Sequence, residues 1–420
     1  MIVKERKKTE KAEGIVSAKR KFIWNMIGST ANAFSSFILL TCVTRMNGSS
    51  DGGVFSLAFS TAQFLASVGC FEARAIQATD IRGERRFVDY FSFRALTTVL
   101  MMFCAVIYVL FSGHTGEKAA VILIVCFYKA IDCMSDSFQG LFQVNDRIDL
   151  SGMALGLRVI LSTVIFGIVL FFTHDMVWGA VSMCAVSILF LSIFDWSISQ
   201  RYGTLREKPE FSSMKSLLFA CLPLFIGSFM ASYIINAPKY AIDTYLNDEI
   251  QNYFGFLLMP AFVINLFSLF AFRPMLTSLA VSWEEKNRKN FYSIIGKSVA
   301  WILFLTVGGV LGAYLLGIPI LNAFSGLDLG LYRWDLVLIM LGGSMNAFIT
   351  VFYYVLTVMR KQLLVLAGYG VGFLSSLILA PLLVRNYGIH GAAVSYGLPM
   401  MITALFFAVC IGIVTKKAQR

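Results

Sequence analysis

Long apolar stretches alternate with short polar connections along the whole chain. About twelve of these stretches reach the length of roughly 20 residues that a helix needs to cross a bilayer. We therefore predict an all-α polytopic membrane protein without a separate soluble domain. The predicted spans are 22–43, 53–73, 91–112, 119–142, 152–173, 177–198, 215–236, 253–278, 294–316, 335–357, 362–384 and 391–414.

The distribution of lysine and arginine predicts how these spans are oriented. Most lysines and arginines lie in alternate connections between the spans. Loops on the cytoplasmic side of a membrane are enriched in these residues, so we assign these connections to that side. This set comprises the tail 1–21, loops 82–86, 147, 201–215, 286–289 and 360–361, and the end 416–420. The opposite loops hold only Arg45, Lys118, Lys239, Arg333 and Arg385. Both termini are therefore predicted to be cytoplasmic, which requires an even number of spans.

Composition narrows the function classes. The net charge of +11 resides mainly in the loops, so the positive-inside rule explains it without a nucleic-acid partner. The eight cysteines form no CxxC pair, and we interpret them as small apolar residues. Three scattered histidines, His114, His174 and His390, make a metal centre improbable. We expect no cofactor.

An internal repeat divides the chain. Gly179–Ser182 opens the sixth span much as Gly391–Ser395 opens the twelfth, and Arg147 follows the fourth span as Arg360 follows the tenth. Each pair is about 212 residues apart, which predicts two six-helix halves in the same orientation. The predicted parts are an N-terminal tail 1–21, a bundle 22–199, a linker 200–214, a bundle 215–414 and a C-terminal tail 415–420.

The fourth span carries the strongest functional signal. Five polar residues in it are three or four positions apart, so they share one helical face: Lys129, Asp132, Asp136, Gln139 and Gln143. Lys129 lies roughly 15 Å from the outer end of the span. A charge at such depth costs at least about 2.5 kcal/mol, so it must face a partner or a water-filled cavity. The pattern favours a protein that moves something polar.

Two interpretations of Lys129 remain open. It can bind the substrate, or it can form an internal ion pair with Asp132, three residues further along the helix. The ion pair would leave Asp136 without a local cation, and an unpaired carboxylate inside a membrane usually marks an ion pathway. Asp136 and Asp132 are therefore candidate sites for a coupling H⁺ or Na⁺.

Other polar residues in the spans have similar alternatives. The candidate lumen residues outside the fourth span are Asn25, Asn32, Arg45, Arg158, Asn236, Lys239 and Asn346. Small polar residues also join helices in membrane bundles without any transport role. Stripes at matching places in both halves favour a shared lumen. For Arg158, as for Arg74 and Glu72, reaching back to the cytoplasmic interface is an equally good interpretation, and Asp195 is ambiguous.

Several motifs resemble the Wzx-type polysaccharide flippases. Asn236-Ala237-Pro238-Lys239-Tyr240 followed by Asn252-Tyr253-Phe254-Gly255-Phe256 is similar to that family's "P-[RK]-Y … G-x-[YF]" pattern. The stretch from Gln139 to Arg147 and the stretch from Tyr387 to Ala393 resemble it too.

The resemblance implies the MATE-like MOP superfamily, with two six-helix bundles around a central cavity. It implies transport of undecaprenyl-diphosphate-linked oligosaccharide across the bacterial inner membrane for O-antigen, capsule or other surface-polysaccharide assembly. A polysaccharide polymerase and a chain-length regulator are candidate partners beside membrane lipid. Alternating access between two bundles is the expected mechanism.

Two alternatives stay open. A multidrug–cation antiporter of the same superfamily would use acidic residues such as Asp132 and Asp136 to hold cationic drugs. A membrane-embedded glycosyltransferase or polysaccharide polymerase would need catalytic groups on large outer loops, and the largest such loop, 318–334, holds one aspartate and one arginine. No Gly-rich phosphate-binding loop with its lysine occurs, which disfavours an ATP-driven pump.

Overall fold

The computed structural model describes residues 17–80, 83–203, 205, 207–272 and 275–417, except for the side chains of 269–271 and 417. Within these ranges, all regular secondary structure is helical, as predicted. Most of the predicted N-terminal tail lies outside them, as do residues 204 and 206 of the predicted linker and the last three residues. The chain separates into two compact units, Met1–Ser228 and Phe229–Arg420.

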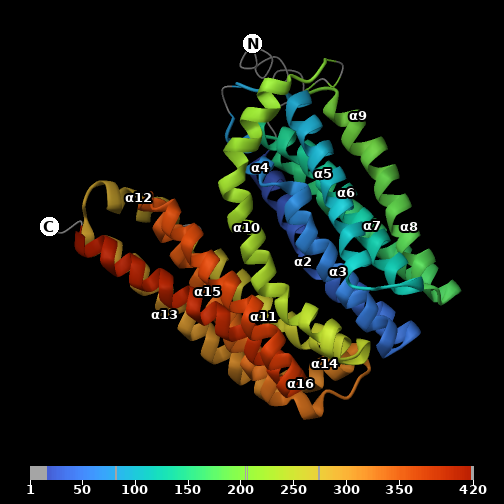
Figure 1. The fold of residues 1–420 in the computed structure, drawn as a ribbon. Coiled ribbons are helices and arrows are strands. Elements are labelled where there is room, and N and C mark those ends of the chain that lie inside the picture. The colour runs from blue at the N-terminus through green and yellow to red at the C-terminus, as the bar shows by residue number, and fades with distance from the viewer. Residues whose placement is uncertain (1–16, 81–82, 204, 206, 273–274, 418–420) are drawn as a thin grey trace. The chain divides into compact units, whose positions relative to one another are not determined.

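The first unit is a bundle of long helices, coloured blue to green in Figure 1. A short π-helical turn, η1 (Leu191–Asp195), joins α8 (Met176–Phe190) to α9 (Trp196–Ser199). The helix α10, Phe211–Tyr245, begins in this unit and continues into the second. The other elements are α2 (Ala18–Asn47), α3 (Ser49–Cys70), α4 (Ala73–Thr79), α5 (Phe87–Phe111), α6 (Gly116–Val144), α7 (Ile148–Thr173), α8 (Met176–Phe190), η1 (Leu191–Asp195) and α9 (Trp196–Ser199).

In this unit, individual residues explain where some helices begin or end and how closely two of them pack. The carboxylate of Asp175 accepts hydrogen bonds from the backbone of Val177 and Trp178 at 2.8 and 3.1 Å, which satisfies free N–H groups at the start of α8. Gly48, with a φ of 101°, lies between α2 and α3. Along their length, α2 and α7 approach closely: a Cβ on Gly152 would lie 2.4 Å from the backbone of Trp24, so only glycine fits there.

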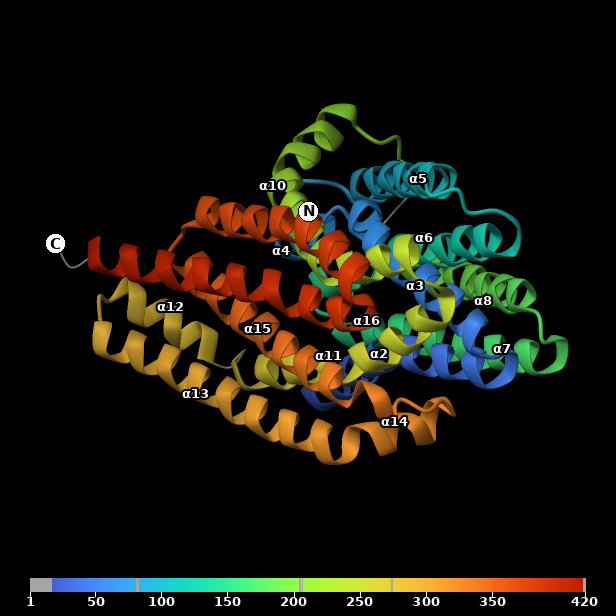
Figure 2. The same ribbon diagram turned by 60° about the horizontal axis from the view of Figure 1, so that its bottom comes forward.

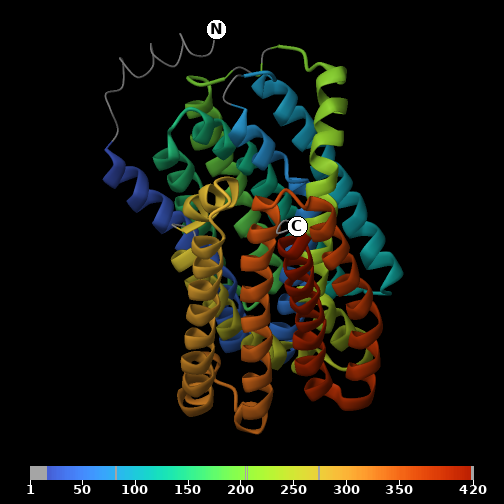
Figure 3. The ribbon, with the colours of Figure 1, turned by 90° about the vertical axis from the view of Figure 1, so that its left-hand side faces the viewer.

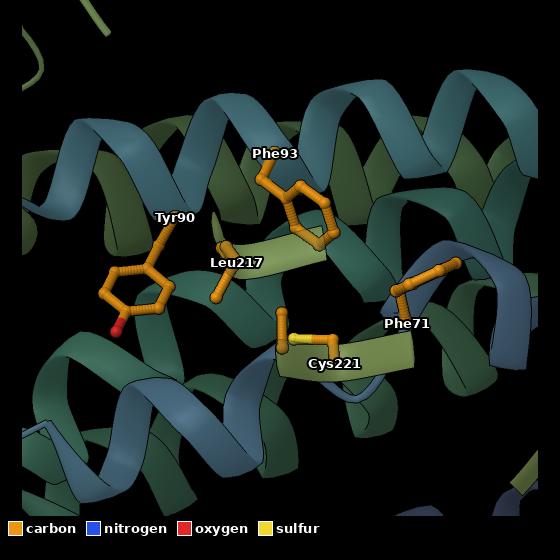
Figure 4. Close-up of a cluster of buried hydrophobic side chains, with 6 residues drawn as sticks. Phe71, Tyr90, Phe93, Leu217 and Cys221 are labelled. Carbon is orange, nitrogen blue, oxygen red and sulfur yellow. The ribbon is translucent and has the colours of Figure 1, made fainter. Parts of the chain in front are cut away.

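The beginning of α10 is held in the first unit by an apolar cluster (Figure 4). Leu217 and Cys221 on α10 are fully buried, and they pack with Phe71, Tyr90 and Phe93. The rings of Phe71 and Phe93 meet edge to face, with centroids 5.7 Å apart. Burial of large aromatic rings is among the main stabilising terms of such a contact.

The second unit is a bundle in which α15 contacts α11, α13 and α16 (Figures 2 and 3). Gly342 on α15 lies against Tyr396 and Gly397 on α16, where a Cβ would be 2.6 Å from the tyrosine ring. The remaining elements are α11 (Asp248–Phe272), α12 (Leu276–Glu284), α13 (Arg288–Gly312), η3 (Ala313–Gly317), α14 (Ile318–Ser325), η4 (Gly330–Tyr332), α15 (Arg333–Val358) and α16 (Gln362–Lys417). A backbone break at Gly388, with φ 59° and ψ −136°, interrupts α16.

Ten helical segments in the described residues are long and apolar enough to cross a membrane. Large apolar side chains on them are exposed, including Phe111, Phe172 and Leu110, as expected for a surface in contact with lipid. The chain is thus a multi-pass integral membrane protein. The ten segments omit α6, which has 29 residues but carries three charges in its middle, and they count α16 once although Gly388 interrupts it. The twelve-span count and the cytoplasmic termini remain predictions.

Candidate functional site

The polar face of α6 forms two clusters of three charged residues each. The first, which we call the upper trio, consists of Lys129, Asp132 and Arg158. The ammonium of Lys129 lies 2.9 Å from Oδ2 of Asp132, and Arg158 on α7 donates to Oδ1 of the same carboxylate. The internal ion pair considered from the sequence is therefore present. The side chain of Arg158 is only 1% exposed and binds Asp132 inside the bundle.

The lower trio consists of Arg74, Asp136 and Arg94. Nη1 of Arg74, on α4, lies 2.7 Å from Oδ1 of Asp136. Nη2 of Arg94, on α5, lies 2.9 Å from Oδ2. The expectation that Asp136 has no cation beside it is therefore wrong. The sequence spacing could not reveal this, because both arginines come from other helices.

Neutral side chains complete the environment of Arg74. Its guanidinium donates to the amide oxygen of Gln139 at 3.1 Å, to that of Gln143 at 3.2 Å and to the hydroxyl of Ser151 at 3.1 Å. A fork of five N–H donors can serve several acceptors at once. Every polar residue on the lower half of the α6 face thus converges on one arginine.

Arg94 and Asp195 extend the network into the core. Arg94 donates to the backbone carbonyls of Gly69 and Cys70 at the end of α3, as well as to Asp136. Asp195 accepts a hydrogen bond of 2.6 Å from the hydroxyl of Ser135 on α6. Arg94 is not among the predicted site residues, although an arginine inside a predicted span is itself a sign of a buried partner. For Asp195 the structure resolves the ambiguity: it is buried.

Burial differs between the members of the two trios. Arg94 and Arg158 are each 1% exposed, whereas Asp136 and Arg74 are 20% and 33% exposed. Lys129 is buried against the aromatic ring of Phe59, with its ammonium 4.9 Å from the ring centroid. Such a cation–π contact stabilises a cation removed from water. The lower trio is therefore the part of the network that solvent or a ligand reaches most directly.

Some guanidinium donors in the network have no acceptor among the described residues. They are Nε and Nη2 of Arg158 and Nε of Arg94, all buried. Buried donors without acceptors are destabilising, and they are common where a polar ligand or water binds. Each trio has two cations for one carboxylate, and the neighbouring carboxylates Asp195 and Glu72 offset the two remaining positive charges. The guanidinium donors without acceptors, rather than a net charge, make the network suited to an anionic ligand.

The other predicted site residues lie on α2, α10 and α15. Asn25, Asn32 and Arg45 lie at exposed positions of α2. In the second unit, Asn236 and Lys239 are buried on α10, and the amide of Asn236 donates to the carbonyl of Ser232 one turn earlier. Asn346 on α15 is partly buried. Their participation in a lumen remains a prediction.

Comparisons with known proteins identify the fold. No family model matches the chain. The capsular polysaccharide biosynthesis protein CapF of Staphylococcus aureus is 20% identical over 399 residues, which cover 92% of this chain and 98% of CapF. Among solved structures, the lipid II flippase MurJ in an inward closed conformation is similar with a TM-score of 0.71 and 15% identity, covering 92% of this chain and 87% of MurJ.

A multidrug resistance MATE family transporter of the MOP superfamily, in an inward-facing conformation, is similar with a TM-score of 0.62 and 15% identity over 98% of both chains. The neighbours are transporters and flippases rather than enzymes. The resemblance inferred from the sequence motifs is therefore confirmed at the level of the fold: this chain is a multi-pass membrane protein with the fold of the MATE-like MOP superfamily transporters.

Proposed function

We propose that the protein is a flippase that moves an undecaprenyl-diphosphate-linked oligosaccharide across the bacterial inner membrane during surface-polysaccharide assembly. Similarity over nearly the whole length to a capsular polysaccharide biosynthesis protein, and to a lipid II flippase in fold, supports this class of substrate. Alternating access is the proposed mechanism, as in transporters built from parallel repeats.

The observation that carries the proposal is the set of buried guanidinium donors of Arg94 and Arg158 that have no acceptor among the described residues. Each carboxylate is already bound by two cations, so neither Asp132 nor Asp136 is available to neutralise a cationic drug. A diphosphate would instead meet arginine donors that lack acceptors. This favours a flippase for an anionic lipid-linked substrate over a multidrug–cation antiporter.

Arg74 is the proposed first contact for the diphosphate. It is the most exposed cation of the network, and three of its four side-chain partners are neutral. A phosphate can displace amide and hydroxyl acceptors from a guanidinium, because hydrogen bonds between charged groups are roughly twice as strong as neutral ones. Asp136 would then hold the guanidinium in place while the neutral groups exchange.

The test replaces one cation of a trio at a time. Arg74→Met leaves Asp136 paired with Arg94, and Lys129→Met leaves Asp132 paired with Arg158, so neither variant creates an unpaired buried carboxylate. We expect both to lower flipping of lipid-linked oligosaccharide in proteoliposomes at least about tenfold, which corresponds to about 1.4 kcal/mol of lost substrate stabilisation. Normal membrane levels would show that the variants fold.

The matched control is Lys21→Met. This lysine also forms an ion pair, with Asp146 at 2.5 Å, but it lies in the first turn of α2 and Asp146 lies in the turn after α6, and neither is a member of a trio. It should flip substrate like the wild type. If Arg74→Met and Lys129→Met flip substrate as fast as the control Lys21→Met, the proposed role of the trios is wrong. Export of lipophilic cations by the wild-type protein, without flipping of the oligosaccharide lipid, would reassign it to the antiporters.

A further inference from the structure

A cavity of about 270 Å³ lies in the second unit, between α11, α13 and α15. Its walls are mostly apolar, and they include Phe272 on α11, Trp301 and Ile302 on α13, and Val351 on α15. The volume falls below the range of about 300–1,000 Å³ that is typical of pockets for drug-sized ligands. The cavity is therefore too small and too apolar for an oligosaccharide, and it suits a single hydrocarbon chain.

The polar groups of the lining differ in whether they already have partners. The hydroxyls of Ser268 and Ser298 donate to carbonyls one turn earlier on their own helices, at 2.7 and 2.9 Å. Lys297 is the one charged residue among the described residues of the lining. Its side chain is exposed and has no hydrogen bond or ion pair with another described residue. The cavity thus has an apolar interior and a cation that is open to an anionic group.

The position of Lys297 on α13 places this cation inside a membrane-spanning helix. It follows Arg288, the first residue of α13, by nine positions, or roughly 14 Å along the helix axis. Further along the same helix, Phe304 and Val307 are exposed, as expected for a helix that borders lipid. A cation at such a position is costly unless it meets an anion or extends to the interface. A lipid phosphate is the anion available beside a lipid-facing helix.

The charges around this end of the second unit favour an anionic headgroup. The acids there are Glu284 and Glu285, and Glu284 already lies 3.9 Å from Arg360. The described bases outnumber them: Lys286, Arg288, Lys289, Lys297, Arg360 and Lys361. In the predicted orientation, this end faces the cytoplasmic leaflet. Basic pockets between membrane helices on that side are typical binding sites for anionic lipid headgroups.

We propose that this cavity binds one anionic glycerophospholipid of the cytoplasmic leaflet. One acyl chain enters the space between α11, α13 and α15, and the ammonium of Lys297 pairs with the phosphate. A single lysine matches the single negative charge of a phosphodiester. The bound chain fills space between three helices of the second unit, so the lipid stabilises this unit. The site does not depend on the flippase function, because its ligand is a constituent of the membrane.

Binding of defined lipids to the purified full chain in detergent tests the proposal. Native mass spectrometry should show tighter binding of phosphatidylglycerol than of phosphatidylcholine to the wild type. Phosphatidylglycerol should also raise the melting temperature, because a ligand that binds the folded state stabilises it. Lys297→Met should weaken phosphatidylglycerol binding at least about fivefold, the effect expected for one basic residue near an anionic headgroup. Equal binding by Lys297→Met and the wild type would overturn the proposal.

A control variant removes the same charge elsewhere in the second unit. Lys416 is exposed near the end of α16 and does not line the cavity. Lys416→Met should therefore bind phosphatidylglycerol like the wild type. A loss as large as that of Lys297→Met would show that net charge, rather than the cavity, attracts the lipid, and would contradict the site.

A third variant tests the apolar part of the site while it keeps the lysine. Ser298→Leu occupies part of the cavity, and it should weaken binding of phosphatidylglycerol without lowering the melting temperature measured in the absence of lipid. Inorganic phosphate should not compete with the lipid, because it has no chain to fill the cavity. Full binding by Ser298→Leu, or competition by inorganic phosphate, would overturn the cavity as the acyl-chain site. Preferential binding of undecaprenyl phosphate would overturn the assignment to a glycerophospholipid.

Discussion

The helices α6 and α15 occupy equivalent places in the predicted repeat, yet their polar side chains have different partners. On α6, the side chains reach across to α4, α5 and α7 and form the two trios. On α15, Thr350 and Thr357 each donate to a backbone carbonyl one turn earlier on the same helix. Of these two threonines, Thr350 also approaches another helix, with its hydroxyl 3.2 Å from Oδ1 of Asn265.

This difference separates two uses of polar residues in a membrane bundle. A hydroxyl satisfied by its own helix needs no partner and places no constraint on its neighbours. A buried charge requires a partner of opposite sign, so it determines which helices must meet and in which register. We infer that α6 is specialised for charge, whereas the charged residues of α15, Arg333 and Asp335, lie at its start.

The comparison depends on α6 and α15 crossing the membrane in the same direction. Reporter fusions after Lys215 and at Arg420 should both give a cytoplasmic signal, an all-or-none result. The reason is the excess of lysine and arginine in the connections assigned to that side. A periplasmic signal at either position would contradict the equivalence of α6 and α15, because the repeat would not be parallel.

Asp132→Leu should produce the largest loss of stability. It leaves the ammonium of Lys129 and the guanidinium of Arg158 buried without their carboxylate. Removal of one partner of a buried ion pair costs about 3–5 kcal/mol. We expect a lower melting temperature in detergent and reduced membrane levels. A melting temperature equal to that of the wild type would show that the upper trio contributes little to the fold.

Lys129→Met should be tolerated better than the double variant Lys129→Met/Asp132→Leu. The single change leaves a balanced pair of Asp132 and Arg158, with an expected loss of no more than about 1 kcal/mol of stability. The double change leaves Arg158 alone in the interior and should resemble Asp132→Leu. Lys129→Arg should retain partial transport, because the charge is kept and the geometry differs. Wild-type stability of the double variant would contradict the role of Arg158.

Thr350→Val in α15 should have the smallest effect. The hydroxyl is partly buried and bonds mainly to its own helix, and hydrogen bonds between helices in membranes average about 0.6 kcal/mol. Thermal unfolding in detergent should therefore stay within a few degrees of the wild type. A loss as large as that of Asp132→Leu would mean that α15 also depends on its polar face, and the contrast between the two helices would fail.

The sequence by itself determined the helical class and the polar face of α6, and it offered the pairing of Lys129 with Asp132 as one of two interpretations. These features depend on spacing within one helix: residues three or four positions apart share a face and can touch. The apolar stretches likewise predicted helices long enough to cross a membrane, because the length of such a helix is imposed by the bilayer.

Only the tertiary structure decided which cations meet Asp136, which carboxylate meets Arg158, and that His390 meets Asp335. The partners are 62 and 42 residues apart for Asp136, 26 for Arg158 and 55 for His390. Spacing within a helix fixes which face a residue occupies, whereas its partner depends on which other helix packs on that face. That choice arises from contacts spread over whole helices, such as the close approach of α2 and α7 at Gly152.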